Sequence, residues 1–332
     1  MKKKIAYILF CLLTINISAQ TSRYKSVHRT IGLMGSQFDI TVIALDEELG
    51  YIYIEEAIAE ISRIEKLISS WEEGSETALI NRNAGIKPVK VSDELFRLVE
   101  RAIQISELTD GAFDISYASK DEIWKFDGSM KNIPSATEIK NSVAKVGYSK
   151  IILDRKNRTV FLKQKGMKIS FGALGKGYAA DKAKEFLISK QVKGGVINAS
   201  GDLSTWGTKV NGDKWLVGIK NPSDKNKIFS WLPIVESSVA TSGNYEKYVT
   251  FDGVKYSHII DPRTGYPTSS VKSASVFAKS AEMSDALATA IYIMGKDSGI
   301  FLINQLDGVE AILIDSKNKI HKSSGIIFDR IP

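Results

Sequence analysis

The chain is poor in the residues that build covalent cross-links. Its 332 residues include one cysteine, Cys11, and three histidines. One cysteine cannot form a disulfide within the chain, so the fold must rest on packing. The chain also lacks a stripe of basic residues interleaved with aromatics, because its basic residues are scattered among acidic ones. A nucleic-acid surface is therefore disfavoured, despite a sequence pI of about 9.1.

The N-terminal apolar run is too short to be an ordinary membrane span. Lysines at positions 2–4 precede apolar residues 5–17, whereas a spanning helix needs about 20 residues. Small residues before Gln20 offer a cleavage site. We therefore predict a secretory signal peptide over residues 1–19 and a single domain over residues 20–332.

Lipidation of Cys11 is the alternative for this segment. The bulky Phe10 and the very short apolar run disfavour it. Cleavage would remove three lysines, which lowers the formal charge from +7 to +4, and would leave no cysteine for thiol chemistry. The expected location is the periplasm or the outer face of the cell envelope, where the protein would act on other envelope proteins. Peripheral association with the membrane is compatible with that location.

Hydrophobic spacing predicts alternating strands and helices in the first half. Residues 30–44 resemble two β-segments broken at residues 34–36. Apolar residues recur at helical spacing over residues 52–68, with charges on the other face. Ser92 is a candidate N-cap for a helix that runs towards Leu108.

Two local signals mark the middle of the chain. Ser135 and Glu138 form a capping box, which predicts a helix that Gly147 would end. Residues 151–162 are rich in β-branched side chains and predict a hairpin that turns at residues 155–158.

The second half predicts short strands around further helices. A helix over residues 285–294 should end at Gly295, and another is expected over residues 298–306. Strands are expected around Val196, Leu216, residues 228–235, Tyr248, residues 274–278 and residues 311–314. Helices alternate irregularly with antiparallel-looking strands, so the predicted fold class is α+β with mixed, largely antiparallel sheets.

The glycine-rich segment at residues 169–181 reads ISFGALGKGYAAD. Glycines let a backbone approach a ligand closely, and a helix N-terminus with a lysine favours an anion. The segment therefore predicts a phosphate or nucleotide cradle between a strand and a helix, with Gly175 where the backbone approaches phosphate. It has neither Walker-loop spacing nor the dinucleotide fingerprint. The alternative is a tight strand-to-helix turn with Lys176 on the surface.

Asp285 and Thr289 are four residues apart on a predicted helix, so their oxygens share a face. A carboxylate and a hydroxyl are hard ligands that suit Mg²⁺. The alternative is that Asp285 caps the helix while Thr289 packs its methyl group inside. His258 precedes a predicted tight turn at residues 261–265. Histidine suits proton transfer near neutral pH, although a lone histidine before a turn is usually structural.

Six ordered motifs together resemble the ApbE-type FAD:protein FMN transferases. The resemblance runs from about Met34 to Glu310. Its motifs are MGS at 34–36, DGAFD at 110–114, the glycine-rich segment, TSGNY at 241–245, and YSHIIDPRTGYP at 256–267 followed by SDALATA at 284–290. The resemblance implies a compact unit of two interlocked lobes with the ligand between them.

Residue by residue, the resemblance implies a complete site. Mg²⁺ would be held by Asp285, Thr289 and the backbone carbonyl of Ala173. His258 and Lys176 are the candidate catalytic residues, with nucleotide binding by His258 more secure than a general-base role. The implied flavin-nucleotide contacts are Met34, Trp71, Ala112, Phe113, Asp114, Ser170, Lys176, His258 and Ile260. Trp71 stands where the family commonly has tyrosine, and Ser170 stands where it usually has aspartate.

The activity implied by the resemblance is Mg²⁺-dependent transfer of FMN from FAD to a threonine or serine hydroxyl of an acceptor protein, with release of AMP. The family pattern suggests acceptors among flavin-bearing subunits of membrane redox complexes and related envelope proteins. Two alternatives stay open. FAD could be hydrolysed to FMN and AMP at the same site, or the protein could be a non-catalytic FAD binder of the envelope.

Overall fold

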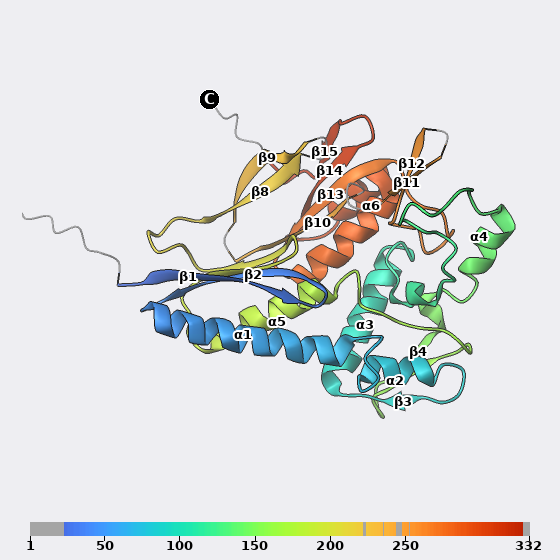
Figure 1. Ribbon diagram of the computed structural model, residues 1–332, viewed down its shortest axis with the longest axis horizontal. Helices are drawn as coiled ribbons and strands as arrows, with labels where there is room; N and C mark the ends of the chain where they lie inside the picture. The colour runs from blue at the N-terminus through green and yellow to red at the C-terminus, as the bar shows by residue number, and fades with distance from the viewer. Residues whose placement is uncertain (1–22, 222–223, 235, 244–247, 252, 328–332) are drawn as a thin grey trace, which may run out of the picture.

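The structure is a computed structural model that describes residues 23–221, 224–234, 236–243, 248–251 and 253–327. The predicted signal peptide and part of the TSGNY motif lie outside the described residues. The elements form an α+β fold with antiparallel sheets, as the sequence predicts (Figure 1).

An eight-stranded sheet organises the larger lobe. Its strand order is β1-β2-β6-β7-β10-β13-β14-β15, and neighbouring strands are antiparallel. The strands are β1 (Lys25–Leu33), β2 (Ser36–Ala44), β6 (Gly195–Ala199), β7 (Asp202–Trp206), β10 (Ser238–Gly243), β13 (Val271–Ala278), β14 (Glu310–Asp315) and β15 (Ile320–Lys322). The break at residues 34–36 is the β1–β2 turn, where Met34 has φ 51° and Gly35 has φ 69°.

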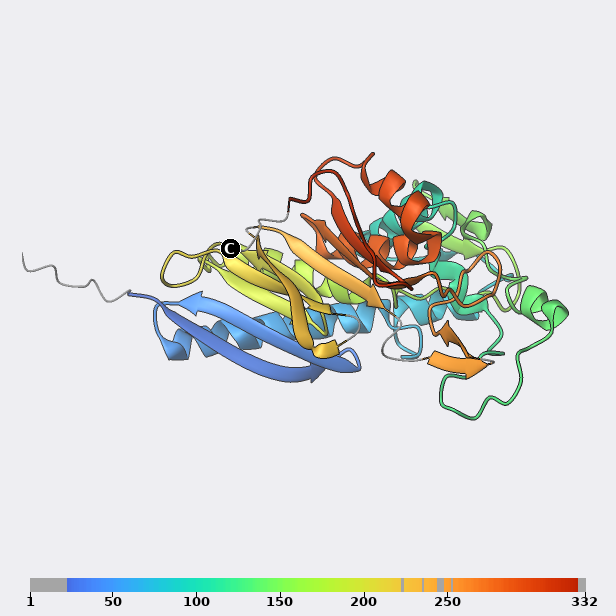
Figure 2. The same ribbon diagram turned by 90° about the horizontal axis from the view of Figure 1, so that it is seen from above.

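Three helices pack against this sheet: α1 (Glu47–Ile68), α5 (Gly175–Ser189) and α6 (Ala281–Ile303). Figure 1 shows α1 and α5 crossing beneath the strands, and Figure 2 shows α1 running along β1 and β2. The predicted helical spacing is confirmed, because Ile54, Ile61 and Ile64 of α1 are fully buried. Asp46 extends α1 beyond the predicted start by accepting a hydrogen bond from the backbone N–H of Leu49.

A smaller lobe gathers at the far end of α1 (Figure 1). It contains α2 (Glu76–Arg82), α3 (Asp93–Leu108), α4 (Ala136–Ser142), the 3-10 turns η1 (Ile115–Ser119) and η2 (Tyr148–Lys150), and a sheet of β3 (Val89–Lys90), β5 (Thr159–Leu162) and β4 (Ile151–Asp154). Two hairpins complete the described fold: β8 (Trp215–Asn221) with β9 (Asp224–Ile234), and β11 (Tyr248–Phe251) with β12 (Val254–Ser257).

The predicted N-caps of α3 and α4 are confirmed, whereas the predicted C-terminal end of α4 is wrong. Ser92 caps α3, and Ser135 forms the expected capping box with Glu138. However, α4 ends at Ser142 rather than at Gly147. The Ser142 carbonyl accepts its hydrogen bond from Asp121 N–H at 2.9 Å, so a partner distant in sequence replaces the next helical turn.

Helix α6 begins one turn before the predicted start because Ser280 caps it. Gly295 breaks it as predicted, with φ 81° and ψ 177°. Among the described residues, α6 is long and apolar enough to cross a membrane by length and composition, with a mean hydropathy of 1.4. It packs against β10 and β13, and the core helix of a soluble protein passes the same test.

The glycine-rich segment differs from its prediction at one point. Residues 163–174 contain no strand, so α5 follows an irregular segment rather than a strand-to-helix junction. Asn81 fixes this segment, because its side chain both donates to the Ile169 carbonyl at 3.0 Å and accepts from Ile169 N–H at 2.8 Å. The sequence therefore located the start of the helix but not the conformation before it.

Candidate functional site

A cavity of about 530 Å³, which we call the main cavity, lies where the two lobes meet. It is lined from the sheet side by β10 and the β6–β7 turn, and from the smaller lobe by residues 112–120. The structure brings ten predicted site residues to its wall: Ala112, Phe113, Asp114, Ser170, Ala173, Lys176, His258, Ile260, Asp285 and Thr289.

Two predicted residues lie in an adjoining pocket of about 190 Å³. Met34 lies on the β1–β2 turn, and Trp71 follows the end of α1 with 78% of its surface exposed. Ser170 and Lys176 line both this pocket and the main cavity. The predicted nucleotide contacts therefore occupy two connected hollows.

The main cavity has a charged end formed by Lys176, Asp202 and Asp285. Lys176 makes an ion pair with Asp202, which is 4% exposed. Asp285 is 7% exposed. Burial raises the pKa of Asp285 to about 7, and the negative charge of Asp202 adds to this rise, while Lys176 and the N–H of Gly177 oppose it. Two buried carboxylates thus share one ammonium group.

Helix geometry presents the predicted metal ligands to this end. The Asp285 carboxylate accepts a hydrogen bond from Gly177 N–H at 3.4 Å. Thr289, one turn later, is within hydrogen-bond distance of the Ser242 hydroxyl at 3.1 Å. The described residues contain no group of three His, Cys, Asp or Glu side chains arranged for a metal. The implied ligand set needs only one carboxylate, and buried like charges surrounded by hydroxyl oxygens fit a hard cation such as Mg²⁺.

His258, just after β12, also lines the main cavity. Its ring packs against Phe126 in a T-shaped arrangement, with 6.5 Å between ring centroids. His258 and Tyr117 also line a neighbouring hollow of about 310 Å³. The histidine therefore stands between two open spaces, where it can contact a ligand in either one.

The turn after His258 is held by its own side chains. The Asp261 carboxylate accepts hydrogen bonds from Arg263 Nε and Nη2 at 2.9 and 2.8 Å. Gly265 has φ 78°, and a Cβ there would lie 2.8 Å from the Ile139 carbonyl oxygen. The predicted tight turn is confirmed, and it fixes the backbone that carries His258.

Several residues that are predicted to contact the ligand also make contacts that stabilise the fold. The two carboxylate oxygens of Asp114 accept hydrogen bonds from the N–H groups of Ser116 and Tyr148, each at 2.7 Å. Burial raises the pKa of Asp114, although these hydrogen bonds oppose the rise. Phe113 is buried in the main hydrophobic core. These residues shape the cavity wall whether or not they touch a ligand.

Gly175 lines the adjoining pocket, and its close approach to a phosphate stays a prediction. A Cβ there would lie 2.8 Å from Ile68 Cδ1 and 3.3 Å from Phe171 Cβ, and both of these residues line the same pocket. The Gly175 N–H is also occupied by the Phe171 carbonyl at 2.6 Å. Gly172, which lines both hollows, has open space where its Cβ would be. The close approach of a ligand to the backbone is thus available at Gly172.

Sequence reasoning missed Asp202 as a site residue. In the sequence, it ends a Ser-Gly-Asp triplet at residues 200–202. In the structure, Ser200 with φ 57° and Gly201 with φ 109° make the tight β6–β7 turn that directs the chain past the cavity. The sequence signal that could have revealed Asp202 was a Gly-Asp pair in a hairpin turn, next to strands that contain β-branched side chains.

The fold and the charged cavity define an α+β protein with a nucleotide-sized cleft between two lobes. The model of the ApbE family matches residues 34–313. The chain therefore belongs to the ApbE family.

Known relatives cover most of the chain. It is 32% identical to the FAD:protein FMN transferase of Klebsiella pneumoniae (strain 342) over 88% of this chain and 90% of that protein. It is 31% identical to the FAD:protein FMN transferase of Treponema pallidum over 84% and 81%. The crystal structure of the ApbE protein of Thermotoga maritima superimposes with a TM-score of 0.81 at 30% identity, covering 91% and 97% of the two chains.

Proposed function

We propose that this protein is an FAD:protein FMN transferase that uses Mg²⁺ to move FMN from FAD to a threonine or serine hydroxyl of an acceptor protein. The observation that carries the proposal is the charged end of the main cavity, where Asp285, Asp202 and Lys176 meet. The relatives named FAD:protein FMN transferase support the same reaction.

The proposed reaction is a phosphoryl-type transfer. The acceptor hydroxyl oxygen bonds to the FMN-side phosphorus, and the bond from that phosphorus to the oxygen bridging to AMP breaks. The hydroxyl proton passes to a base, and AMP leaves with the bridging oxygen. Mg²⁺ held by Asp285, Thr289 and the Ala173 carbonyl would offset the charge of the pyrophosphate. The protein's own contribution is then mostly positioning.

In this scheme Lys176 would interact with both Asp202 and a phosphate of the nucleotide. It is paired with Asp202 and also lines both hollows, so its ammonium group can neutralise a phosphate oxygen beside the carboxylates. Ser170 lines both hollows as well. A dinucleotide spanning the two hollows would therefore have its pyrophosphate next to Lys176.

His258 is proposed to bind and orient the nucleotide first and to act as the base second. The turn after it is fixed, and it lies between the main cavity and the neighbouring hollow of about 310 Å³. Both features favour a residue that holds a ligand in one orientation. The same place would let it take a proton from a hydroxyl entering through the neighbouring hollow.

The proposed setting is the cell envelope. A protein exported by the predicted signal peptide would meet acceptors on the periplasmic or outer face, such as flavin-bearing subunits of membrane redox complexes. The basic N-terminus and its apolar run support this proposal.

Mass spectrometry of a candidate acceptor tests the proposal. After incubation with FAD, Mg²⁺ and this protein, we expect the acceptor mass to rise by one FMN phosphoester and AMP to accumulate in equal amount. AMP and free FMN released without an acceptor would instead identify a hydrolase. FAD that stays intact in every mixture would indicate that the protein is a non-catalytic FAD binder.

A further inference from the structure

Helices α5 and α6 touch backbone to backbone immediately beside the charged end. A Cβ at Gly177 would lie 2.2 Å from the Ala281 carbonyl oxygen and 2.8 Å from the Glu282 nitrogen. No side chain fits in such a gap, so glycine is required for the helices to approach this closely. The contact joins the first turn of α5 to the first turn of α6.

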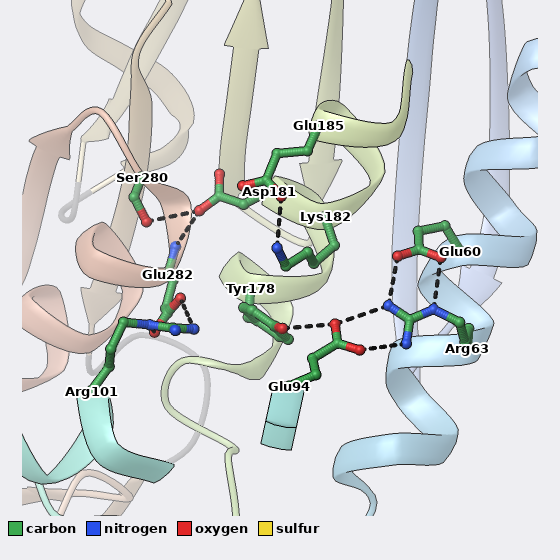
Figure 3. Close-up of polar contacts among 10 residues, drawn as sticks. All are labelled: Glu60, Arg63, Glu94, Arg101, Tyr178, Asp181, Lys182, Glu185, Ser280 and Glu282. Carbon is green, nitrogen blue, oxygen red and sulfur yellow. Dashed lines mark hydrogen bonds and ion pairs between the residues drawn. The ribbon is translucent and has the colours of Figure 1, made fainter. Parts of the chain in front are cut away.

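One helical turn later on the same face of α5, Asp181 ties the two helices together. One of its carboxylate oxygens accepts hydrogen bonds from the Ser280 hydroxyl at 2.8 Å and from Glu282 N–H at 2.9 Å (Figure 3). The other accepts from the Ser204 hydroxyl of β7 at 2.9 Å. A single carboxylate therefore joins α5, the start of α6 and the central sheet.

A third helix supports the same turn of α6 from outside. Arg101 of α3 makes a two-pronged ion pair with Glu282, with nitrogen–oxygen distances of 2.8 and 2.9 Å (Figure 3). Glu282 is only 8% exposed. Burial raises the pKa of Glu282, and the charge of Arg101 opposes that rise. The first turn of α6 is thus held by α5 and α3, and β7 holds the Asp181 side chain of α5.

The two helices joined here also carry the charged end of the main cavity. Lys176 immediately precedes Gly177 on α5, and Asp285 lies one turn after Ala281 on α6. Gly177 N–H reaches Asp285 directly at 3.4 Å. The position of Asp285 therefore depends on where α6 lies against α5.

We propose that Gly177 and Asp181 form a helix lock that sets the register of α6 on α5 and so positions Asp285 for Mg²⁺. Both are positioning residues, since they act through Asp285 rather than on the substrate. The inference rests on the proposed function for its metal ligand, but it concerns how that ligand is held. Supporting contacts around metal ligands are typically worth 10–100-fold in metal affinity.

The test compares two substitutions of Asp181 by direct metal binding, with Mn²⁺ as the probe and electron paramagnetic resonance as the readout. Asp181→Ala removes all three hydrogen bonds, and we expect Mn²⁺ affinity to fall about 10-fold or more. Asp181→Asn keeps an oxygen for Ser280 and Glu282 N–H, and its amide can donate to Ser204. We expect this variant to retain affinity within about 3-fold of wild type.

Tyr178→Phe is the matched control. Tyr178 neighbours Gly177 on α5, but its hydroxyl donates to Glu94 of α3 at 2.8 Å, not to α6 (Figure 3). We expect this variant to lower the melting temperature without changing Mn²⁺ affinity. Equal Mn²⁺ affinity in Asp181→Ala and Tyr178→Phe, at similar loss of stability, would overturn the lock.

Two further variants separate the possible failures. If Asp181→Ala does not fold, Gly177→Ala tests the same register, and wild-type Mn²⁺ affinity in that variant overturns the proposal. Asp285→Ala reports on the metal ligand itself. Weak binding in Asp285→Ala with normal binding in Asp181→Ala overturns the lock alone. Normal binding in Asp285→Ala overturns the metal assignment in the proposed function and the lock with it.

Discussion

The two hollows of the site are built in opposite ways. The charged end of the main cavity is made by two helices in backbone contact and by the start of β7, and its carboxylates Asp202 and Asp285 are almost fully buried. The adjoining pocket is made by the β1–β2 turn and the segment after α1, and its Trp71 is 78% exposed. A buried charge costs stability unless it is compensated, whereas an exposed ring costs little.

This difference predicts how the two hollows respond to substitution. At the charged end, changes should act on metal binding and chemistry, because the groups there are fixed and poorly hydrated. At the exposed pocket, changes should act on FAD affinity alone and by small factors. Each of the following experiments would weaken or sharpen that contrast.

The largest effect is expected at Asp285. Asp285→Ala should abolish FMN transfer, because the proposed metal loses its only carboxylate ligand. The fold should survive, since the change removes a buried charge next to Asp202. Transfer is measured by acceptor mass, and stability by thermal melting. Thr289→Val, which deletes one oxygen and keeps the shape, should lose less activity. Full turnover in Asp285→Ala would disprove the metal assignment.

His258→Asn is expected to give the next largest effect. If His258 mainly binds, FAD affinity should fall and saturating FAD should restore much of the rate. If it is the base, affinity should stay nearly intact and the rate should fall by about two to four orders of magnitude. Calorimetry and steady-state kinetics on the same variant distinguish the two. Wild-type values in both measurements would remove His258 from the site.

Asp285 should also make stability and metal binding depend on pH. Its ordinary pKa of 3.8 is raised to about 7, so the folded protein keeps a proton here that the unfolded chain has released. Without metal, stability should therefore fall as pH rises from about 4 to 7 and level off above that. Mg²⁺ competes with this proton, so its affinity should rise about tenfold per pH unit below 7.

Thermal melting at pH 5 and pH 8, with and without Mg²⁺, measures both effects. Asp285→Asn is the matched control because it has the same size and no titration. The variant should lose the part of the pH dependence that comes from this group. An identical pH profile in the wild type and the variant would show that Asp285 is already ionised at pH 5.

Local signals in the sequence predicted the elements that depend on neighbouring residues. Ser92, the Ser135–Glu138 capping box and Gly295 each act within a turn or two of chain, and each was placed correctly. The end of α4 was missed because its hydrogen bond comes from Asp121. The short α2 was missed as well, since seven residues carry little periodicity.

The site shows the same limit more sharply. Motifs named the residues that line the main cavity, but not the direction in which a glycine faces. Gly175 faces Ile68 on the wall of the adjoining pocket, whereas Gly177 faces the backbone of Ala281 and serves packing between two helices that are distant in sequence. Asp202 could not be predicted as a site residue because its role depends on Lys176 and Asp285, which only the folded chain brings together.

The smallest effect is expected at Trp71. Trp71→Ala should weaken FAD binding by about 1 kcal/mol, or roughly fivefold, because an exposed ring contributes little more than stacking area. The maximal transfer rate should be unchanged, since the ring lies in the adjoining pocket and not at the charged end. Trp71→Tyr keeps an aromatic face and adds a hydroxyl, so it should bind FAD within about twofold of wild type.

Calorimetry gives the affinity, and the acceptor mass assay at saturating FAD gives the rate. If Trp71→Ala lowers the saturated rate as strongly as His258→Asn, the adjoining pocket takes part in the chemistry and the contrast between the two hollows fails.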